Sequence, residues 1–199
     1  MDRIQMKEKL KTMLTPRRYQ HSIGVMNTAK ELARRFGADE GKAEIAGLLH
    51  DCAKDIDKSK MVDMCDELGV ELDDLKKEQR ALIHPDLGAK LVQTEFDITD
   101  PEIISAIKHH TLGRPDMTKL EKILYLADYI EPNREEMEGL AELRALCLED
   151  LDRAMLFATD MTISYVLSKK KVLHKQSLAT REYFRGLVEK SNCKGKVTT

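Results

Sequence analysis

Apolar residues recur at three- and four-residue spacing along almost the whole chain, and no stretch alternates convincingly as a strand would. This pattern predicts helices between the turn signals. The expected helices cover about residues 16–36, 40–51, 59–68, 85–96, 101–110, 119–130 and 142–170. We therefore expect one all-α domain of about eight helices over residues 1–190, followed by a flexible tail at residues 191–199.

Several of these boundaries carry specific capping signals. Thr15 followed by Pro16 is a typical helix start, since threonine caps the first turn and proline suits the first helical position. Asp100 and Pro101 repeat that signal, and Gly37 is a plausible helix stop. Glycine and proline together number 15 and are dispersed, so the sequence offers no linker between domains.

Composition narrows the class of protein. The chain has 199 residues, 42% of them hydrophobic and 34% charged, as in an ordinary globular protein. A net charge of −2 disfavours broad nucleic-acid binding. The N-terminal segment lacks a signal-peptide core, and no run approaches the roughly 20 apolar residues of a membrane span. Four scattered cysteines without CxxC spacing favour a reducing, cytoplasmic location.

The stretch "GLLHDCAKD" at residues 47–55 places four ionisable groups directly after an apolar run, which is costly unless each is paired or bound to a metal. Imidazole and carboxylate without thiolate suit iron, manganese, zinc or nickel. The number of candidates is too large for one ion and suits two ions if Asp51 bridges them. Two such ions about 3.5–4 Å apart are a standard clamp for displacement at phosphorus. The candidates are His21, His50, Asp51, His84, His109, His110 and Asp128.

Neighbouring residues add charge to this set, although each has a simpler interpretation. Lys54 shares a helical face with the His50-Asp51 pair and would hold a phosphate as a point charge, or it is an ordinary solvated lysine. The same choice applies to Arg17 and Arg18, which precede His21 by four and three residues. Asp55 either orients a ligand or pairs with Lys58, and Cys52 reads as a small packing residue.

With these residues in view, the chain resembles the HD superfamily of metal-dependent phosphohydrolases, whose signature is H…HD…D. It is more closely similar to the YqeK family of symmetrical bis(5′-nucleosyl)-tetraphosphatases. Similar segments span residues 18 to about 184. They are "RYQHSIGV", "GLLHDCAKD", "IHPDLGAKL", "HHTLGRPDMTKLEKILYLADYIEPNR" and, more weakly, "VLHKQSLATREYF".

The resemblance implies two ions, iron first and manganese, nickel or zinc as alternatives. The first would be held by His21, His50, Asp51 and Asp128, and the second by Asp51, His84 and His110. Spacing alone permits either histidine of the 109–110 pair, but the family places one directly before the threonine of "HTxG". By the same resemblance, Arg18, Lys54, Thr111 and Arg134 would face the phosphates. His174 would pack or lie near the base.

The implied reaction is hydrolysis of diadenosine tetraphosphate and related dinucleoside polyphosphates to two ADP. Asp51 would hold the metal geometry, Lys54 would offset charge on the phosphoryl oxygens, and His84 is one candidate proton donor. Related hydrolases of guanosine tetraphosphate carry "HDxxED", and cyclic-dinucleotide phosphodiesterases carry Gly-Tyr-Pro; this chain has neither. A dimetal oxygenase and a nucleotide sensor without turnover stay open, as does a homodimer.

Overall fold

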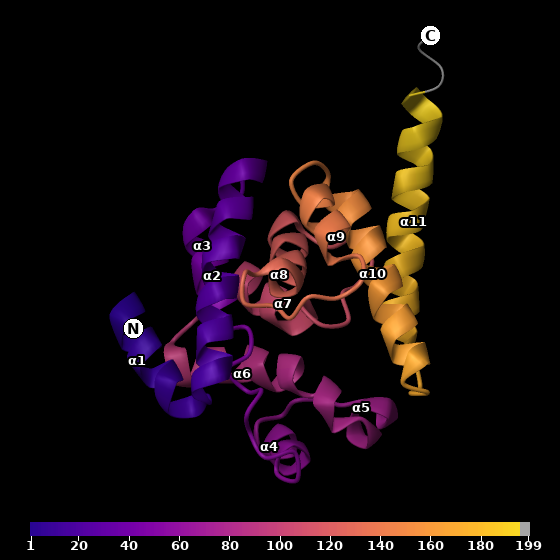
Figure 1. Cartoon of the computed structure of the whole chain (residues 1–199). Helices are drawn as coiled ribbons and strands as arrows, with labels where there is room; N and C mark the ends of the chain where they lie inside the picture. Colours follow the sequence, from indigo (N-terminus) through magenta and orange to yellow (C-terminus); the bar gives the residue numbers. More distant parts are fainter. Residues whose placement is uncertain (196–199) are drawn as a thin grey trace.

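The structure of the protein, a computed structural model, describes residues 1–195. All regular elements in that range are helical, which confirms the all-α class. The elements, shown in Figure 1, are α1 (Arg3–Met13), α2 (Pro16–Phe36), α3 (Glu40–Leu49), α4 (Met61–Glu67), α5 (Asp74–Glu78), the 3₁₀ helix η1 (Arg80–Leu82), α6 (His84–Phe96), α7 (Pro101–His109), α8 (Lys119–Ile130), α9 (Leu140–Leu146), α10 (Leu151–Ser168) and α11 (Lys175–Gly195).

The predicted capping signals act as expected. The Thr15 side chain accepts a hydrogen bond from the Arg18 amide at the start of α2, with Pro16 as the first helical residue. Gly37 ends that helix with a φ of 63°, a left-handed conformation that glycine adopts without strain. Asp100 caps α7 through the Glu102 amide. These caps fix where α2 and α7 begin, and both helices carry candidate ligands.

The eleven α-helices between residues 1 and 195 exceed the expected number of about eight. The expected helix over 142–170 is two helices, because Asp150 is extended, with φ −152° and ψ 113°, and its side chain caps the first turn of α10. Helices α5 and η1 were not expected, because they are too short to show apolar residues at helical spacing. Residues 191–195 of the expected tail continue α11, and residues 196–199 lie outside the described range.

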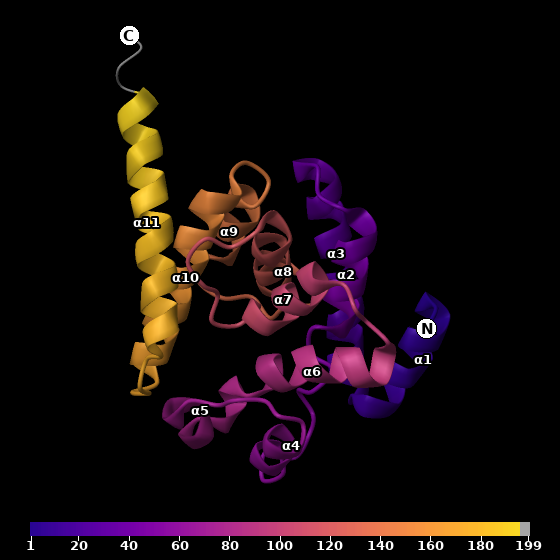
Figure 2. The same ribbon diagram turned by 180° about the vertical axis from the view of Figure 1, so that it is seen from behind.

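The helices that carry the candidate ligands meet at the centre of the molecule. Figures 1 and 2 show α8 and α7 between the α2–α3 pair on one side and α9, α10 and α11 on the other, with α6 crossing at one end. Helices α2 and α3 cross closely at Gly47, where a Cβ atom would lie 2.7 Å from the Met26 Cα. This close crossing brings the second half of α3 against the middle of α2.

The core around this centre is apolar and extensive. Leu48 and Leu49 on α3 and Leu124 and Tyr125 on α8 are all buried. Helices α10 and α11 run side by side, and α11 continues beyond the rest of the molecule (Figures 1 and 2). Among the helices of residues 1–195, none has both the length and the apolar character needed to cross a bilayer.

Candidate metal centre

Six polar side chains from five parts of the chain converge at the centre. His21 comes from α2, Asp128 from α8, and His84 is the first residue of α6. His50 and Asp51 directly follow α3, in tight turns in which the Cys52 amide donates to the Leu49 carbonyl at 3.1 Å. Consecutive residues on a regular helix diverge by about 100°, and this tightening allows both side chains to face the same place. The sixth residue, His110, follows the last residue of α7.

Within the described residues, these side chains form three overlapping groups. In each group the potential ligand atoms all lie within 4.8 Å of one another. One group contains His21, His50 and Asp51, a second contains Asp51, His84 and His110, and a third joins His50 and His110 to Asp128. Asp51 belongs to the first two groups, which is the arrangement a bridging carboxylate requires.

The histidine rings are oriented by the hydrogen bonds of their Nδ1 atoms. His50, His84 and His110 donate from Nδ1 to the carbonyls of Gly47, Ala81 and Ile107, at 2.8, 2.8 and 2.7 Å. A carbonyl can only accept, so these Nδ1 atoms carry the proton and the Nε2 lone pairs face the centre. This is the tautomer that binds metal ions through Nε2.

The inward-facing atoms are therefore acceptors that face other acceptors. The Nε2 atoms of His84 and His110 lie 3.2 Å apart, and Asp51 Oδ1 lies 3.3 Å from His84 Nε2. His21 Nε2 lies 3.0 Å from Asp128 Oδ1. Within residues 1–195, three buried atoms of this cluster have no hydrogen-bond partner, namely His21 Nε2, His50 Nε2 and Asp51 Oδ1. Buried acceptors in mutual contact are costly unless a cation lies between them, so this donor set fits divalent metal ions.

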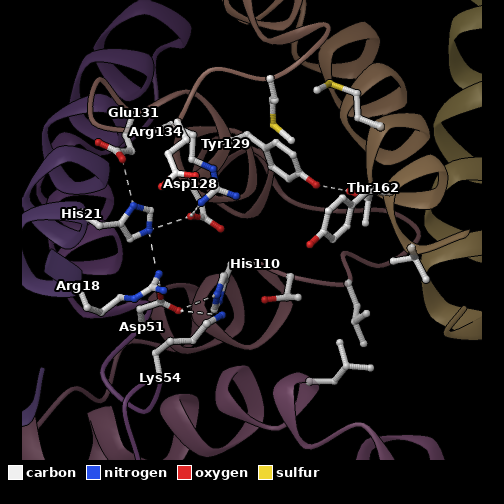
Figure 3. Close-up of a pocket in the computed structure, with 18 of the residues that line it drawn as sticks. Arg18, His21, Asp51, Lys54, His110, Asp128, Tyr129, Glu131, Arg134 and Thr162 are labelled. Carbon is white, nitrogen blue, oxygen red and sulfur yellow. Dashed lines mark hydrogen bonds and ion pairs between the residues drawn. The ribbon is translucent and has the colours of Figure 1, made fainter. Parts of the chain in front are cut away.

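Three basic side chains lie around the two carboxylates of Asp51 and Asp128 (Figure 3). Arg18 Nη1 lies 2.8 Å from Asp51 Oδ2, and Arg134 Nη1 lies 3.7 Å from Asp128 Oδ1. Lys54 Nζ lies 2.9 Å from His84 Nε2 and 3.7 Å from Asp51 Oδ1.

These charges set the protonation states of the centre. Burial opposes ionisation of Asp51, but His50 and Lys54 outweigh it and hold the pKa of Asp51 well below its usual range. Burial also opposes the charge on Asp128, yet the adjacent His21 imidazole, His50 and Arg134 outweigh it and lower the pKa of that carboxyl. Burial and the nearby Lys54 ammonium both lower the pKa of His84, which stays neutral. The centre thus holds charged carboxylates and a neutral imidazole ready to ligate.

Other predicted residues lie at the edge of the cluster or away from it. Thr111 Oγ1 is 3.3 Å from His84 Nε2. His109 turns away, with its Nδ1 2.9 Å from the Ser105 carbonyl oxygen. His174 is buried, with its Nε2 2.9 Å from Asp73 Oδ2, and it lines the cleft. Burial raises the pKa of the Cys52 thiol to about 12, which agrees with a packing role.

Two open alternatives have structural answers. Arg17 is largely exposed and pairs with Glu135, whereas Arg18 reaches the centre. Asp55 neither contacts the cluster nor pairs with Lys58. Its Oδ2 accepts from the Thr15 amide at 2.7 Å and from the Thr15 hydroxyl at 2.9 Å, so it joins the start of α2 to the turn that follows Asp51.

The cluster opens into a cleft of about 840 Å³. The metal-capable residues and the three cations lie on one side, and an apolar wall lies on the other (Figure 3). The wall comes from α8, the segment between α8 and α9, α10 and the loop after α10. This volume accommodates a ligand the size of a nucleotide. The wall consists of Tyr129, Met137, Met161, Tyr165, Val166, Val172 and Leu173.

Sequence reasoning missed this wall and one buried acid. Methionine and tyrosine at helical spacing are typical of a core, so Met161 and Tyr165 gave no signal. Glu131 is 1% exposed, and its Oε1 accepts from His21 Nδ1 at 3.1 Å. The available signal was its position directly before Pro132, at the end of an apolar helix. A buried acid is rare unless it is paired, so an acid at the end of a buried helix indicates a polar partner in the interior.

Comparisons with known proteins agree with this architecture. The family model of the HD domain matches residues 18–133. The chain is 42% identical over 171 residues to "Bis(5'-nucleosyl)-tetraphosphatase, symmetrical" of Halalkalibacterium halodurans, covering 86% of this chain and 90% of the relative. It is 43% identical over 173 residues to the protein of the same name from Bacillus subtilis, covering 86% and 91%.

A solved structure extends the agreement to the fold. The crystal structure of a predicted HD superfamily hydrolase involved in NAD metabolism from Clostridium acetobutylicum superposes with a TM-score of 0.90 at 41% sequence identity. The superposition covers 94% of this chain and 98% of that one. The similarity therefore includes α10 and α11, which lie beyond the part matched by the family model.

Proposed function

Since this chain belongs to the HD-domain family of symmetrical bis(5′-nucleosyl)-tetraphosphatases, we propose that it hydrolyses diadenosine tetraphosphate and related dinucleoside polyphosphates at the central phosphates, giving two ADP. The observation that carries the proposal is the cluster of buried acceptors facing one another next to three basic side chains. A centre of this kind attracts metal cations, and its surroundings attract a polyphosphate.

We propose two ion positions, with iron as the first candidate and manganese, nickel or zinc as alternatives. His21, His50, Asp51 and Asp128 would hold the first ion, and Asp51, His84 and His110 the second. Bound there, two divalent ions supply Lewis acidity and an activated water for attack on phosphorus. The neutral His84 and the ionised Asp51 and Asp128 are in the protonation states that ligation requires.

The surrounding cations would bind and orient the phosphates. Arg18 and Lys54 now contact Asp51 and would turn toward phosphoryl oxygens, where they offset the charge that develops during the reaction. Arg134 stacks over the Tyr129 ring, with its Cζ 5.6 Å from the ring centre, so its guanidinium is held beside Asp128. The Thr111 hydroxyl is a further donor to a phosphate oxygen.

The leaving ADP needs a proton, and we assign its supply to Lys54 in preference to His84. His84 donates a hydrogen bond from Nδ1–H to the Ala81 carbonyl, so its Nε2 is unprotonated and cannot supply a proton. The Lys54 ammonium lies 2.9 Å from that same Nε2 and has protons to donate. His84 is then a ligand, and Lys54 is the acid.

The apolar wall on α10 and the following loop would take a nucleoside. Tyr165 is 55% exposed and Val172 is 64% exposed on the cleft. A purine is a flat aromatic group, and its packing against such side chains removes apolar surface from water and favours binding. We also propose a cytoplasmic location, because the four cysteines are free thiols. Homodimer formation stays a prediction.

Product analysis tests the proposal. Protein loaded separately with Fe²⁺, Mn²⁺, Ni²⁺ or Zn²⁺ is mixed with diadenosine tetraphosphate, and the nucleotides are separated. ADP alone, lost in Asp51→Ala, is the expected result. AMP together with ATP would contradict central cleavage. Tight nucleotide binding without turnover would indicate a sensor, and oxygen-dependent conversion of a small organic substrate would indicate an oxygenase.

A further inference from the structure

Glu131 differs from the groups that orient the other candidate ligands. His50, His84 and His110 each donate from Nδ1 to a neutral carbonyl of the main chain, whereas His21 donates to the Glu131 carboxylate. We propose that Glu131 is a positioning residue that acts through His21 and sets the metal affinity of the first ion position. This inference rests on the proposed function, in which His21 is a ligand of that ion.

The carboxylate of Glu131 is held at both oxygens. It is 1% exposed, and Oε1 lies 3.1 Å from His21 Nδ1. Oε2 accepts from the main-chain amide of Asn133 at 2.8 Å and from its side-chain amide at 3.1 Å. Among the described residues, the one ion-pair contact of Glu131 is the one with His21. A buried carboxylate with a single potential counter-charge acts strongly on that group.

The sequence builds this contact at the end of α8. Pro132 disfavours helical conformation for the preceding residue, and Glu131 is extended, with φ −55° and ψ 148°. The chain then turns, and the Arg134 amide donates to the Glu131 carbonyl at 3.0 Å. The same turn presents Arg134 to Asp128. One short segment therefore serves two candidate ligands of the first ion, His21 and Asp128.

Helix α2 leaves room for the carboxylate by having a glycine at position 24. A Cβ atom on Gly24 would lie 2.2 Å from Glu131 Oε2, which no side chain tolerates without a shift. Gly24 lies three residues after His21 and so lies near the same helical face. The glycine and the buried acid are thus complementary parts of one contact.

An anionic acceptor on Nδ1–H makes the imidazole a stronger electron-pair donor at Nε2 and fixes the ring plane. Partners of this kind typically change metal affinity or activity by 10–100-fold. Glutamine at position 131 keeps the shape but replaces one oxygen by a donor. That donor would face either His21 Nδ1–H or the Asn133 amide, so one of the two hydrogen bonds must be lost.

The experiment measures Mn²⁺ binding by equilibrium dialysis in a His84→Ala background, where the second position is removed and the first remains. We expect Glu131→Gln to weaken Mn²⁺ binding about tenfold or more. The matched control is Glu135→Gln, an exposed acid four residues along, which should bind Mn²⁺ as the parent does. Unfolding in chelator reports any general loss of stability separately. Equal Mn²⁺ affinity of Glu131→Gln and the parent would overturn the inference.

Turnover by the otherwise unchanged protein gives the second readout. Glu131→Gln should be slow at low Mn²⁺ and should recover as Mn²⁺ is raised, with the KM for diadenosine tetraphosphate unchanged at saturating metal. Gly24→Ala should reproduce this behaviour by displacing the carboxylate. A defect that Mn²⁺ does not reduce would contradict a role through His21. Absence of both binding and turnover in the wild-type protein would instead contradict the proposed function itself.

Discussion

The two halves of the cluster are built differently. The half around His21 and Asp128 lies between α2 and α8 and has its own carboxylate as well as a share of Asp51. The half around His84 and His110 shares that Asp51 and adds two imidazoles, with the Lys54 ammonium 2.9 Å from one of them. The first half offers four potential ligands, two of them carboxylates, and the second offers three with one carboxylate. We therefore expect the first half to bind metal more tightly than the second.

The histidines also differ in how far along the chain the partner of each ring lies, and only the first half contains a long-range partner. His50, His84 and His110 each donate to the carbonyl three residues earlier, so their orientation is set within one turn. The partner of His21, by contrast, lies 110 positions away. Short-range support survives changes in packing between helices better than long-range support does. Disturbing the contact between α2 and α8 should therefore affect the first half more.

Replacing the shared residue should have the largest effect. Asp51→Asn removes the charge that both halves use, and two ions contribute several kcal/mol of transition-state stabilisation, so we expect turnover to fall about 1000-fold or more. Metal content should fall in parallel, as measured by elemental analysis after gel filtration. Helical content by circular dichroism provides the control. A loss of less than tenfold would contradict a bridging role.

Lys54→Met tests the second half alone. We expect turnover to fall about 100-fold, because the variant loses a phosphate contact and the proposed proton donor. Metal content should be unchanged or higher, since the ammonium beside His84 opposes a cation there. Rates are compared at saturating substrate and metal. If metal content fell with the rate, Lys54 would support the ion position and would not be the acid.

Arg134→Gln tests the cation beside the first half. The guanidinium lies 3.7 Å from Asp128 and is partly exposed, so its removal should raise the KM for diadenosine tetraphosphate about tenfold, with a smaller effect on kcat. Arg17→Gln is the matched control, since Arg17 is exposed and pairs with Glu135. Steady-state kinetics of both variants decide the matter. Equal increases in KM for the two variants would mean that any positive charge near the cleft favours substrate binding, and that the position of Arg134 beside Asp128 has no specific role.

The smallest effect on activity is expected from Glu121, which supports the helix end that carries His110 without contacting the cluster. Burial would raise the pKa of Glu121, but hydrogen bonds from His109, Arg114 and Ser105 outweigh it and lower the pKa from 4.5 to about 2. A carboxyl whose pKa is lower in the folded state than in the unfolded state stabilises the folded protein at pH values above the unfolded-state pKa. That stability is lost as the pH falls from about 4.5 toward 2.

Glu121→Gln should therefore lower the free energy of unfolding by about 1–3 kcal/mol at pH 7. The difference from the wild type should shrink as the pH is lowered toward 2. Urea unfolding of both proteins at several pH values measures this directly. A difference that stayed constant with pH would show that the charge of Glu121 does not contribute.

The sequence was informative where one residue or one turn decides the outcome. Thr15, Pro16, Asp100 and Gly37 marked helix ends correctly, because capping is local chemistry. The division of the expected helix over 142–170 at Asp150 was missed, since an acid within an apolar pattern also fits a continuous helix.

The convergence of the cluster could be expected only from the resemblance to the YqeK family. Irregular spacing between His21, His50 and His84 contains no information about where α2, α3 and α6 meet. Glu131 and the apolar wall at Tyr165 depend on the same tertiary packing. They escaped sequence analysis because a buried acid and an apolar helix face each have ordinary interpretations until their neighbours are known.

In the proposed centre, two unequal ion positions share Asp51. The most direct test is the number of Mn²⁺ ions bound per chain, measured by equilibrium dialysis for the wild type and for His84→Ala. We expect a tight and a weaker binding event in the wild type, with only the weaker one lost in His84→Ala. Loss of the tighter event, or a single event in the wild type, would contradict this arrangement.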